Sequence, residues 1–303
     1  MQISKWLKQN TESLAHRCIA VTGSTGGLGR ALCAYLAELD AELILLDRNV
    51  TRSEAHRREL QARFPDCRIT CISLDMEDLF SAKRAAKELG AMGIDVLIHN
   101  AGAYSIPREK CESGYENVFQ INFATPYYLT NLLLPTLRAR GGRIVIVGSI
   151  AHRYGKTTPE DVDFSGHRSA ARIYGNSKRY LMYATASLLE GEDRIALSLT
   201  HPGISQTNIT AHYPKLIYTV IKYPMRLIFS RPRRAVLPIL AGVFGSTGAE
   251  TWIGPRLFDI WGLPQKKRLS GCSEDERRQI AATAQQVLVR CERVIEQEDE
   301  HGS

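Results

Sequence analysis

Residues 18–29 read CIAVTGSTGGLG, and this stretch decides the fold. The apolar run at 18–21 predicts a short buried strand, and the spacing of apolar residues over 28–39 predicts a helix directly after the turn. The glycines between them let the backbone turn tightly and approach a pyrophosphate, while the helix N-terminus offers free N–H groups. A flexible loop is the alternative, but a strand before the turn and a helix after it favour a phosphate-binding turn.

The same alternation of strand and helix continues along the chain. The predicted strands are 18–21, 42–46, 68–73, 95–99, 143–147 and 196–200, and the predicted helices are 28–39, 52–63, 77–89, 115–139 and 174–190. Continuous apolar strands separated by helices are typical of a parallel sheet that is covered on both faces. We therefore expect an α/β, doubly wound parallel sheet (Rossmann fold), in which ligands lie at the carboxyl ends of the strands.

A single domain is expected over residues 15–264. The composition is that of a globular protein, with 44% hydrophobic and 23% charged residues, and 303 residues suffice for one large core. Residues 204–249 interrupt the alternation, and 265–303 read as a polar C-terminal helix followed by a charged tail.

The cysteines and histidines favour a cytoplasmic protein without a metal. The seven cysteines include no Cys-x-x-Cys pair, and the eight histidines show no metal-ligand spacing, so reduced thiols and no metal site are expected. No apolar run approaches the ~18 residues that span a bilayer, and residues 1–17 lack the apolar core of an export signal. His152 and His167 are expected to be exposed rather than to line a pocket.

Asp47 and Arg48, at the end of the second predicted strand, bear on the choice of cofactor. A carboxylate here can accept hydrogen bonds from an adenosine ribose and would repel a 2′-phosphate, which favours NAD. Arg48 could instead pair with that phosphate, which would favour NADP. The strand-end position of Asp47 makes NAD the expected cofactor, with NADP possible. A solvated Asp-Arg pair is the plain alternative.

Ser149, Tyr174 and Lys178 form a candidate catalytic set. Ser149 closes the predicted strand 143–147, and the four-residue spacing puts Tyr174 and Lys178 on one helical face. A nearby ammonium group favours the phenolate form of a tyrosine, whose ordinary pKa of about 10 makes it a poor base. Tyr174 could then exchange a proton with a substrate oxygen held by Ser149, while hydride moves to or from a nicotinamide. Taken alone, a Tyr-x-x-x-Lys pair is more often a surface pair.

Together these motifs resemble the short-chain dehydrogenase/reductase family. The run HNAG at 99–102 is similar to its Asn-Asn-Ala-Gly motif, and Asn122 to the helix asparagine of its catalytic tetrad. Pro202-Gly203 with Thr207 is similar to the segment that covers the nicotinamide, and Asp75 to the acidic residue near the adenine ring. The matches follow the family's order from residue 18 to about 254.

The resemblance implies a role for each matching residue. Tyr174 would be the general acid/base, Ser149 would position the substrate oxygen, and Lys178 would lower the pKa of Tyr174 and bond the nicotinamide ribose. Asn122 would support a proton-relay water by opening its helix locally. The cofactor-binding residues would be Thr22, Gly23, Ser24, Thr25, Gly27, Leu28, Gly29, Asp47, Arg48, Asp75, Met76, Asn100, Ala101, Gly102, Tyr174, Lys178, Pro202, Gly203 and Thr207.

Within the family, the runs YGNSK at 174–178, LTNLLLP at 129–135 and IGP at 253–255 resemble the retinol-dehydrogenase-like branch. This implies an NAD(P)-dependent oxidoreductase that acts on a lipophilic alcohol, aldehyde or ketone, with 204–249 as a substrate-capping segment. The branch usually carries a neutral residue in place of Asp47, which sets this chain apart from its common preference for NADP. A non-catalytic dinucleotide sensor or scaffold on the same fold is the alternative, although it would not require the complete tetrad.

The excess of basic side chains, 39 against 32 acidic, lies within residues 194–249, which hold seven basic residues and no acidic one. The amphipathic pattern of 213–234 would suit a peripheral contact with an anionic membrane, but lining of the substrate pocket or a subunit contact is slightly favoured. Its tyrosines form no stripe on a helix, so nucleic acid is not expected as a partner. A homo-oligomer, a dimer or a tetramer, is expected.

Overall fold

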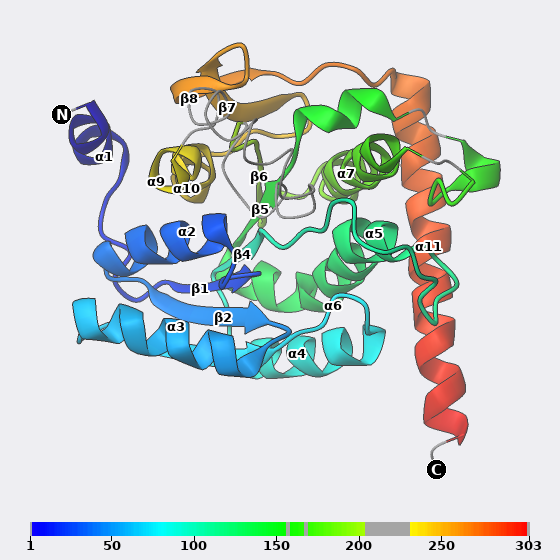
Figure 1. The fold of residues 1–303 in the computed structure, drawn as a ribbon, viewed down its shortest axis with the longest axis horizontal. Coiled ribbons are helices and arrows are strands. Elements are labelled where there is room, and N and C mark those ends of the chain that lie inside the picture. The colour runs from blue at the N-terminus through cyan, green and yellow to red at the C-terminus, as the bar shows by residue number, and fades with distance from the viewer. Residues whose placement is uncertain (1, 156–157, 167–168, 204–230, 302–303) are drawn as a thin grey trace, which may run out of the picture.

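The expected parallel sheet is present and has two further strands. In the computed structural model, which describes residues 2–155, 158–166, 169–203 and 231–301, eight strands pair in the order β3-β2-β1-β4-β5-β6-β7-β8 (Figure 1). The strands are β1 Cys18–Thr22, β2 Glu42–Asp47, β3 Ile69–Ser73, β4 Val96–His99, β5 Arg143–Val147, β6 Ala196–Thr200, β7 Thr251–Leu257 and β8 Trp261–Arg268. Neighbouring strands are parallel except for the antiparallel pair β7–β8. The predicted doubly wound α/β fold is confirmed.

Helices cover both faces of the sheet (Figure 1). The longer ones are α1 Gln2–Asn10, α2 Gly27–Glu38, α3 Val50–Arg63, α4 Leu79–Met92, α6 Thr125–Arg140, α7 Ala170–Leu188, α10 Leu237–Phe244 and α11 Glu274–His301. The shorter segments are α5 Asn117–Phe119, the π-helix η1 Gln120–Ala124, the 3-10 helices η2 Ile150–Tyr154 and η3 Pro159–Asp161, and α9 Pro232–Ala235.

Side chains alternate along the strands between two apolar cores, as the period of two in a strand requires. Ile144 and Ile146 of β5 belong to the core formed with α4, α6, α7 and α11. Val145 and Val147 belong to the core formed with α1, α2 and α10. The sheet is therefore buried on both faces, which explains why its strands are continuously apolar.

The six predicted strands agree with the structure to within one residue at each end. The helix predicted at 115–139 is instead three consecutive segments, because the π-helix η1 widens the backbone between α5 and α6. Helix α7 begins at Ala170 rather than at Tyr174, so Tyr174 lies in its second turn. Among the described helices, none combines the length and the apolar composition needed to cross a membrane.

The C-terminal part is more closely built into the core than the sequence indicates. Strand β8 runs across the expected boundary at 264–265, because it pairs with β7 from Trp261 to Arg268. Helix α11 buries an apolar stripe at helical spacing, which joins the core beside α6 and α7. The stripe consists of Ile280, Ala284, Val287, Cys291 and Ile295. The described residues of 265–303 thus share the main core.

A buried cation and a buried histidine tie the C-terminal segment to the catalytic edge. The side chain of Arg179 is 1% exposed, and its Nη2 lies 2.9 Å from Glu276 Oε1 at the start of α11. His152 Nδ1 lies 2.7 Å from Ser149 O, and its Nε2 lies 2.9 Å from Ser270 O. The expectation that His152 is exposed is therefore wrong, because its second partner comes from a segment far along the chain. His167 lies outside the described residues.

Trp252 of β7 offers a test of this packing. Its side chain is fully buried, and its ring stacks on His201 at 5.1 Å with His152 edge-on at 5.4 Å. Replacing Trp252 with Ala should lower the free energy of unfolding by about 3–5 kcal/mol, because a large cavity would remain. Urea unfolding measures this loss. The control is Trp261→Ala in the same hairpin, since Trp261 is 38% exposed and should cost much less; equal losses would contradict this account of the core.

Candidate active site

The glycine-rich turn after β1 has room only for glycine at two positions. A Cβ on Gly29 would lie 2.3 Å from Gly23 O, and one on Gly23, where φ is +66°, would lie 2.9 Å from Ala101 Cα. Helix α2 begins at Gly27, and no side chain caps it at Gly26. The turn is therefore a backbone cradle at an uncapped helix N-terminus, which suits a phosphate group.

The ends of β1 and β4 are locked together beside this cradle. Asn100 Nδ2 donates hydrogen bonds to Thr22 O at 2.9 Å and to Gly23 O at 3.0 Å. Thr22 Oγ1 accepts from the backbone N–H groups of Asn100 and Ala101, at 3.0 and 2.9 Å. The buried Asn100 Oδ1 has no hydrogen-bond partner among the described residues. The cradle and this unpaired oxygen fit a bound dinucleotide.

Asp47 is turned into the protein beneath the glycine-rich turn. Its side chain is 4% exposed, and it accepts hydrogen bonds from Ser24 Oγ at 2.5 Å, from Thr25 N at 3.0 Å and from Thr25 Oγ1 at 2.9 Å. Ser53 Oγ donates to it as well, at 3.0 Å. The structure thus gives Asp47 a task that the sequence did not indicate, because its carboxylate fixes the shape of the turn.

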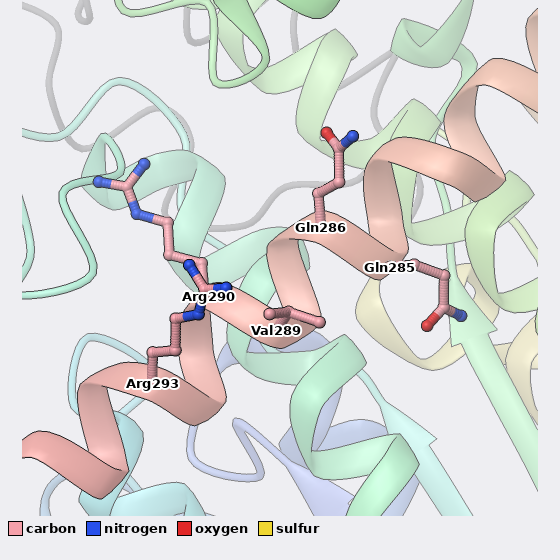
Figure 2. Close-up of a pocket in the computed structure, with 5 residues that line it drawn as sticks. All are labelled: Gln285, Gln286, Val289, Arg290 and Arg293. Carbon is pink, nitrogen blue, oxygen red and sulfur yellow. The ribbon is translucent and has the colours of Figure 1, made fainter.

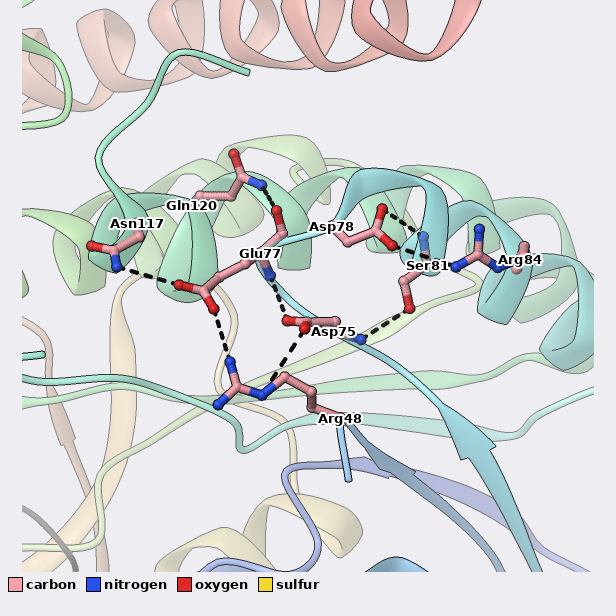
Figure 3. Close-up of polar contacts among 8 residues, drawn as sticks. All are labelled: Arg48, Asp75, Glu77, Asp78, Ser81, Arg84, Asn117 and Gln120. Carbon is pink, nitrogen blue, oxygen red and sulfur yellow. Dashed lines mark hydrogen bonds and ion pairs between the residues drawn. The ribbon is translucent and has the colours of Figure 1, made fainter. Parts of the chain in front are cut away.

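Arg48, in contrast, is held by two carboxylates at the surface (Figure 3). Its Nη1 lies 2.8 Å from Glu77 Oε2, and its Nε lies 3.9 Å from Asp75 Oδ2. Glu77 is fixed in turn, because Asn117 Nδ2 donates to its Oε1 at 3.3 Å. Asp75 and Arg48 are therefore neighbours in the structure. Glu77 was not predicted, and its position two residues after Asp75 was the available signal.

Lys178 and Asn122 meet beside the end of β4. Lys178 is 3% exposed, and its Nζ donates to Val147 O at 3.1 Å. A Cβ on Gly102 would lie 3.1 Å from Asn122 Oδ1 and 3.2 Å from Lys178 Nζ, so the two side chains flank one glycine. Asn122 Oδ1 accepts from Ala103 N at 2.8 Å, and its Nδ2 donates to Ser177 Oγ at 3.0 Å. Burial lowers the pKa of Lys178 to about 8.

Tyr174 lies between Ser149 and Tyr104. Burial raises the pKa of Tyr174, the adjacent Ser149 hydroxyl lowers it in part, and Tyr104 adds to the increase. The rings of Tyr104 and Tyr174 meet edge to face at 5.2 Å, and Lys178 Nζ lies 6.0 Å from the centroid of the Tyr174 ring. The four residues of the expected tetrad are thus brought to one edge of the sheet. Tyr104 was not predicted, although an aromatic residue just beyond HNAG was a signal.

Of the remaining expected residues, Pro202 and Gly203 follow β6 at the same edge, and Gly203 has a φ of +78°. A Cβ there would lie 2.7 Å from Ile260 O, which ties this segment to the β7–β8 hairpin. Met76 is buried and contributes its backbone O to Thr125 Oγ1 at 2.7 Å. Thr207 lies outside the described residues. Within those residues no group of three His, Cys, Asp or Glu side chains could hold a metal.

A surface pocket elsewhere does not belong to this site. It lies along α11 and is lined by Gln285, Gln286, Val289, Arg290 and Arg293 (Figure 2). All five side chains come from one helix, and none of them is expected in the catalytic or cofactor-binding set. The pocket is therefore not part of the candidate active site.

Comparisons with known proteins identify the family to which the chain belongs. The family described as short chain dehydrogenase matches residues 17–215. Retinol dehydrogenase 14 of Mus musculus is 32% identical over 212 residues, which cover 65% of this chain and 63% of that protein. Polyprenol dehydrogenase of Mus musculus is 29% identical over 248 residues, which cover 76% of this chain and 74% of that protein. The chain thus spans less than two thirds of the first of these relatives.

Two solved structures are similar to this chain in fold. An uncharacterized protein from Mycobacterium Paratuberculosis has a TM-score of 0.72 and 27% identity, over 94% of this chain and 96% of that one. The Pseudomonas aeruginosa RhlG/NADP active-site complex has a TM-score of 0.59 and 26% identity, over 77% and 93%. The parallel sheet and the glycine cradle after β1 are typical of a dinucleotide-binding α/β protein. The chain belongs to the short-chain dehydrogenase family. Its similarity to retinol dehydrogenase 14 supports the predicted retinol-dehydrogenase-like branch.

The buried histidines around the site give a pH prediction. Burial lowers the pKa of His99 to about 3 and that of His201 to about 4. Between pH 6.5 and these values the unfolded chain takes up protons that the folded chain does not, so stability falls as the pH falls. We expect proton uptake by His201 in the unfolded chain to lower the free energy of unfolding by about 1–2 kcal/mol between pH 6.5 and pH 5.

Urea unfolding at several pH values tests this prediction. The variant His201→Asn should show a flatter dependence of unfolding free energy on pH, whereas His16→Asn, at an exposed position, should keep the slope of the parent protein. Parallel curves for the parent and His201→Asn would show that His201 is not the group responsible.

Proposed function

We propose that this chain is an NAD-dependent oxidoreductase of a lipophilic alcohol and the corresponding aldehyde or ketone, with Tyr174 as general acid/base. The observation that carries the proposal is the meeting of Ser149, Tyr174, Lys178 and Asn122 at one edge of the sheet, beside the glycine cradle. A dinucleotide sensor or scaffold would need the cradle but not this set of side chains. The catalytic reading is therefore favoured over the binding-only alternative.

In the proposed reaction the protein's part is proton transfer and positioning. Ser149 donates or accepts a hydrogen bond at the substrate oxygen, and Tyr174 takes the hydroxyl proton when an alcohol is oxidised or returns it when a carbonyl is reduced. The bound nicotinamide supplies the hydride acceptor or donor. Below a pH of about 8 the Lys178 ammonium is charged and favours the phenolate of Tyr174.

Asn122 is proposed to support a water that relays this proton to solvent. The residue lies in the π-helix η1, and such single-turn π segments are frequent at functional sites. Its side-chain amide is held by Ala103 and Ser177, so the widened turn is fixed in place. Hydrogen bonds to Ala103 and Ser177 therefore hold Asn122 at the point where η1 widens the helix.

NAD is the proposed cofactor, with NADP as the alternative. The buried carboxylate of Asp47 lies beneath the turn and would repel a 2′-phosphate. The exposed guanidinium of Arg48 is already paired with Glu77 and Asp75, which reduces its availability to that phosphate. The solved relative RhlG binds NADP, so the two cofactors must be compared directly.

The lipophilic substrate, location and assembly are also proposals. Two curated relatives are named for retinol and polyprenol, which supports a lipophilic alcohol here. The seven cysteines are free thiols, which supports a cytoplasmic location. A peripheral membrane contact through 213–234 and a homo-oligomer (dimer or tetramer) are retained as proposals; residues 213–230 lie outside the described part of the chain.

Replacing Tyr174 with Phe tests the assignment of the acid/base. Turnover of a lipophilic alcohol should fall by about 100-fold or more, because the proton can no longer be transferred, while the Kd for NADH changes little. The matched control is Tyr104→Phe, which keeps the neighbouring ring and should retain most of the activity. Comparable turnover in Tyr174→Phe and the parent enzyme would refute the assignment.

Replacing Glu77 with Gln tests the cofactor proposal. The change removes the nearer of the two negative charges that hold Arg48 but keeps the acceptor for Asn117, so Arg48 becomes more available to a 2′-phosphate. We expect the parent to bind NADH more tightly than NADPH, and the variant to bind NADPH about three- to tenfold more tightly than the parent does. Fluorescence titration measures both affinities. Tighter binding of NADPH than NADH by the parent would overturn the choice of NAD.

A further inference from the structure

The turn between β7 and β8 carries an unusual concentration of exposed apolar side chains. Leu257 is 52% exposed, Phe258 83% and Trp261 38%. The other large apolar side chains exposed in the described residues are dispersed over α3, α4, α6, η2 and α11. Isolated exposed apolar residues need no explanation, but three within five residues at one tip mark a contact surface.

The backbone of this turn is strained and firmly held. Phe258 and Asp259 have φ values of +53° and +59°, in the left-handed region that a bulky aromatic residue rarely adopts. Asp259 Oδ1 lies 2.8 Å from Lys267 Nζ, its Oδ2 lies 3.5 Å from Arg153 Nη2, and its backbone O lies 3.1 Å from His201 Nε2. These contacts fix the turn so that Phe258 points outward, where the residue is 83% exposed and packing against the described residues does little to compensate for the strain.

The tip also lies on the active-site side of the molecule. Thr200, the last residue of β6, pairs with Ile253, only the third residue of β7. Most of the hairpin therefore extends beyond the carboxyl edge of the parallel sheet, by about 15 Å from Ile253 to Phe258 at the usual rise per residue. Ile260 O approaches Gly203, in the segment proposed to cover the nicotinamide. The apolar tip thus stands beside the site.

The charges near the tip select its partner. Arg256, next to the tip, is exposed, and the single acidic residue of the hairpin, Asp259, is already paired with the two cations Arg153 and Lys267. The whole hairpin, residues 251–268, carries four basic side chains and one acidic one. A symmetric contact between two hairpins would bring these cations together, which costs energy. An anionic surface would attract them.

We propose that the tip formed by Leu257, Phe258 and Trp261 inserts into the interface of an anionic lipid bilayer, with the neighbouring Arg256 against the headgroups. Aromatic side chains favour this interface, and basic residues add attraction to anionic lipid. The carboxyl edge of the sheet then faces the bilayer. This inference deepens the proposed function, because a lipophilic alcohol would reach the site from the membrane.

Cosedimentation with phosphatidylcholine vesicles, with and without phosphatidylserine, tests the docking. The parent protein should bind the vesicles that contain phosphatidylserine, and rising salt should weaken this binding. The double variant Leu257→Ser/Phe258→Ser should bind at least about tenfold more weakly, since two apolar side chains no longer leave water. Arg256→Glu should weaken the preference for anionic vesicles. Val289→Ser, an exposed apolar residue of α11, is the matched control and should bind like the parent.

Tryptophan fluorescence gives a second, local readout. Trp252 is fully buried and Trp6 is 8% exposed, whereas Trp261 is 38% exposed and belongs to the tip. Vesicles with brominated acyl chains should therefore quench part of the parent emission, and Trp261→Phe should remove that quenchable part. Quenching that persists in Trp261→Phe would place the contact elsewhere and overturn the proposal.

The remaining outcomes separate docking from catalysis. Failure of the parent to bind anionic vesicles, or equal binding by the Leu257/Phe258 variant, would overturn the docking proposal. So would a dimer in sedimentation equilibrium that Phe258→Ser dissociates, because the tip would then be covered by a second copy. Turnover of a short, water-soluble alcohol, measured without vesicles, tests the proposed oxidoreductase independently and should be the same in the hairpin variants and the parent.

Discussion

The hydroxyl of Thr22 joins the ends of β1 and β4, and the rest of the candidate site depends on this contact. In the order β3-β2-β1-β4-β5, the chain moves outward from β1 to β3 and then crosses to β4, so β1 and β4 are neighbours although three helices separate them in sequence. Ligands bind at such switch points because the connections diverge there and leave a crevice. Thr22 Oγ1 accepts hydrogen bonds from two successive N–H groups beyond β4 and holds this crevice to a defined width. The cradle, Asn100 and Gly102 are all placed by that contact.

Local patterns were sufficient to predict the first six strands, β1 to β6, whereas contacts between distant segments could not be predicted from them. The chemistry of Tyr174 and Lys178 follows from a four-residue spacing on one helix. The β7–β8 hairpin contains Gly254, Pro255, Gly262 and Pro264, so its sequence does not show the pattern of a strand. The two segments are strands because they pair with each other. The burial of His152 depends on Ser270, and the orientation of Asp47 depends on hydroxyls from two separate segments.

Two adjacent cations on α7 connect the site with the C-terminal segment. Lys178 extends to Val147 O beside the catalytic residues, and Arg179, about 100° further around the helix, extends to Gly271 O and Glu276. A buried cation is costly unless it is paired, so each requires its partners to be in place. Displacement of the segment at 271–276 would leave Arg179 unpaired within the helix that carries Tyr174. The start of α11 is thus a structural requirement of the active-site helix, even though none of its residues reaches the site.

The distribution of charge gives the molecule an orientation relative to any anionic surface. The positive excess of the sequence lies in residues 194–268, which include β6 and the β7–β8 hairpin, and the acidic excess lies in the C-terminal 269–303. Among the described residues of this basic part, Arg256 is exposed next to the tip, so an anionic surface favours the approach of the hairpin. The carboxyl ends of β6 and β7 belong to that part, and they lie at the edge where Tyr174 and Ser149 meet. Apolar side chains at Phe258 and its neighbours then determine how close the approach becomes, because electrostatic attraction brings the surface near but does not remove water from it.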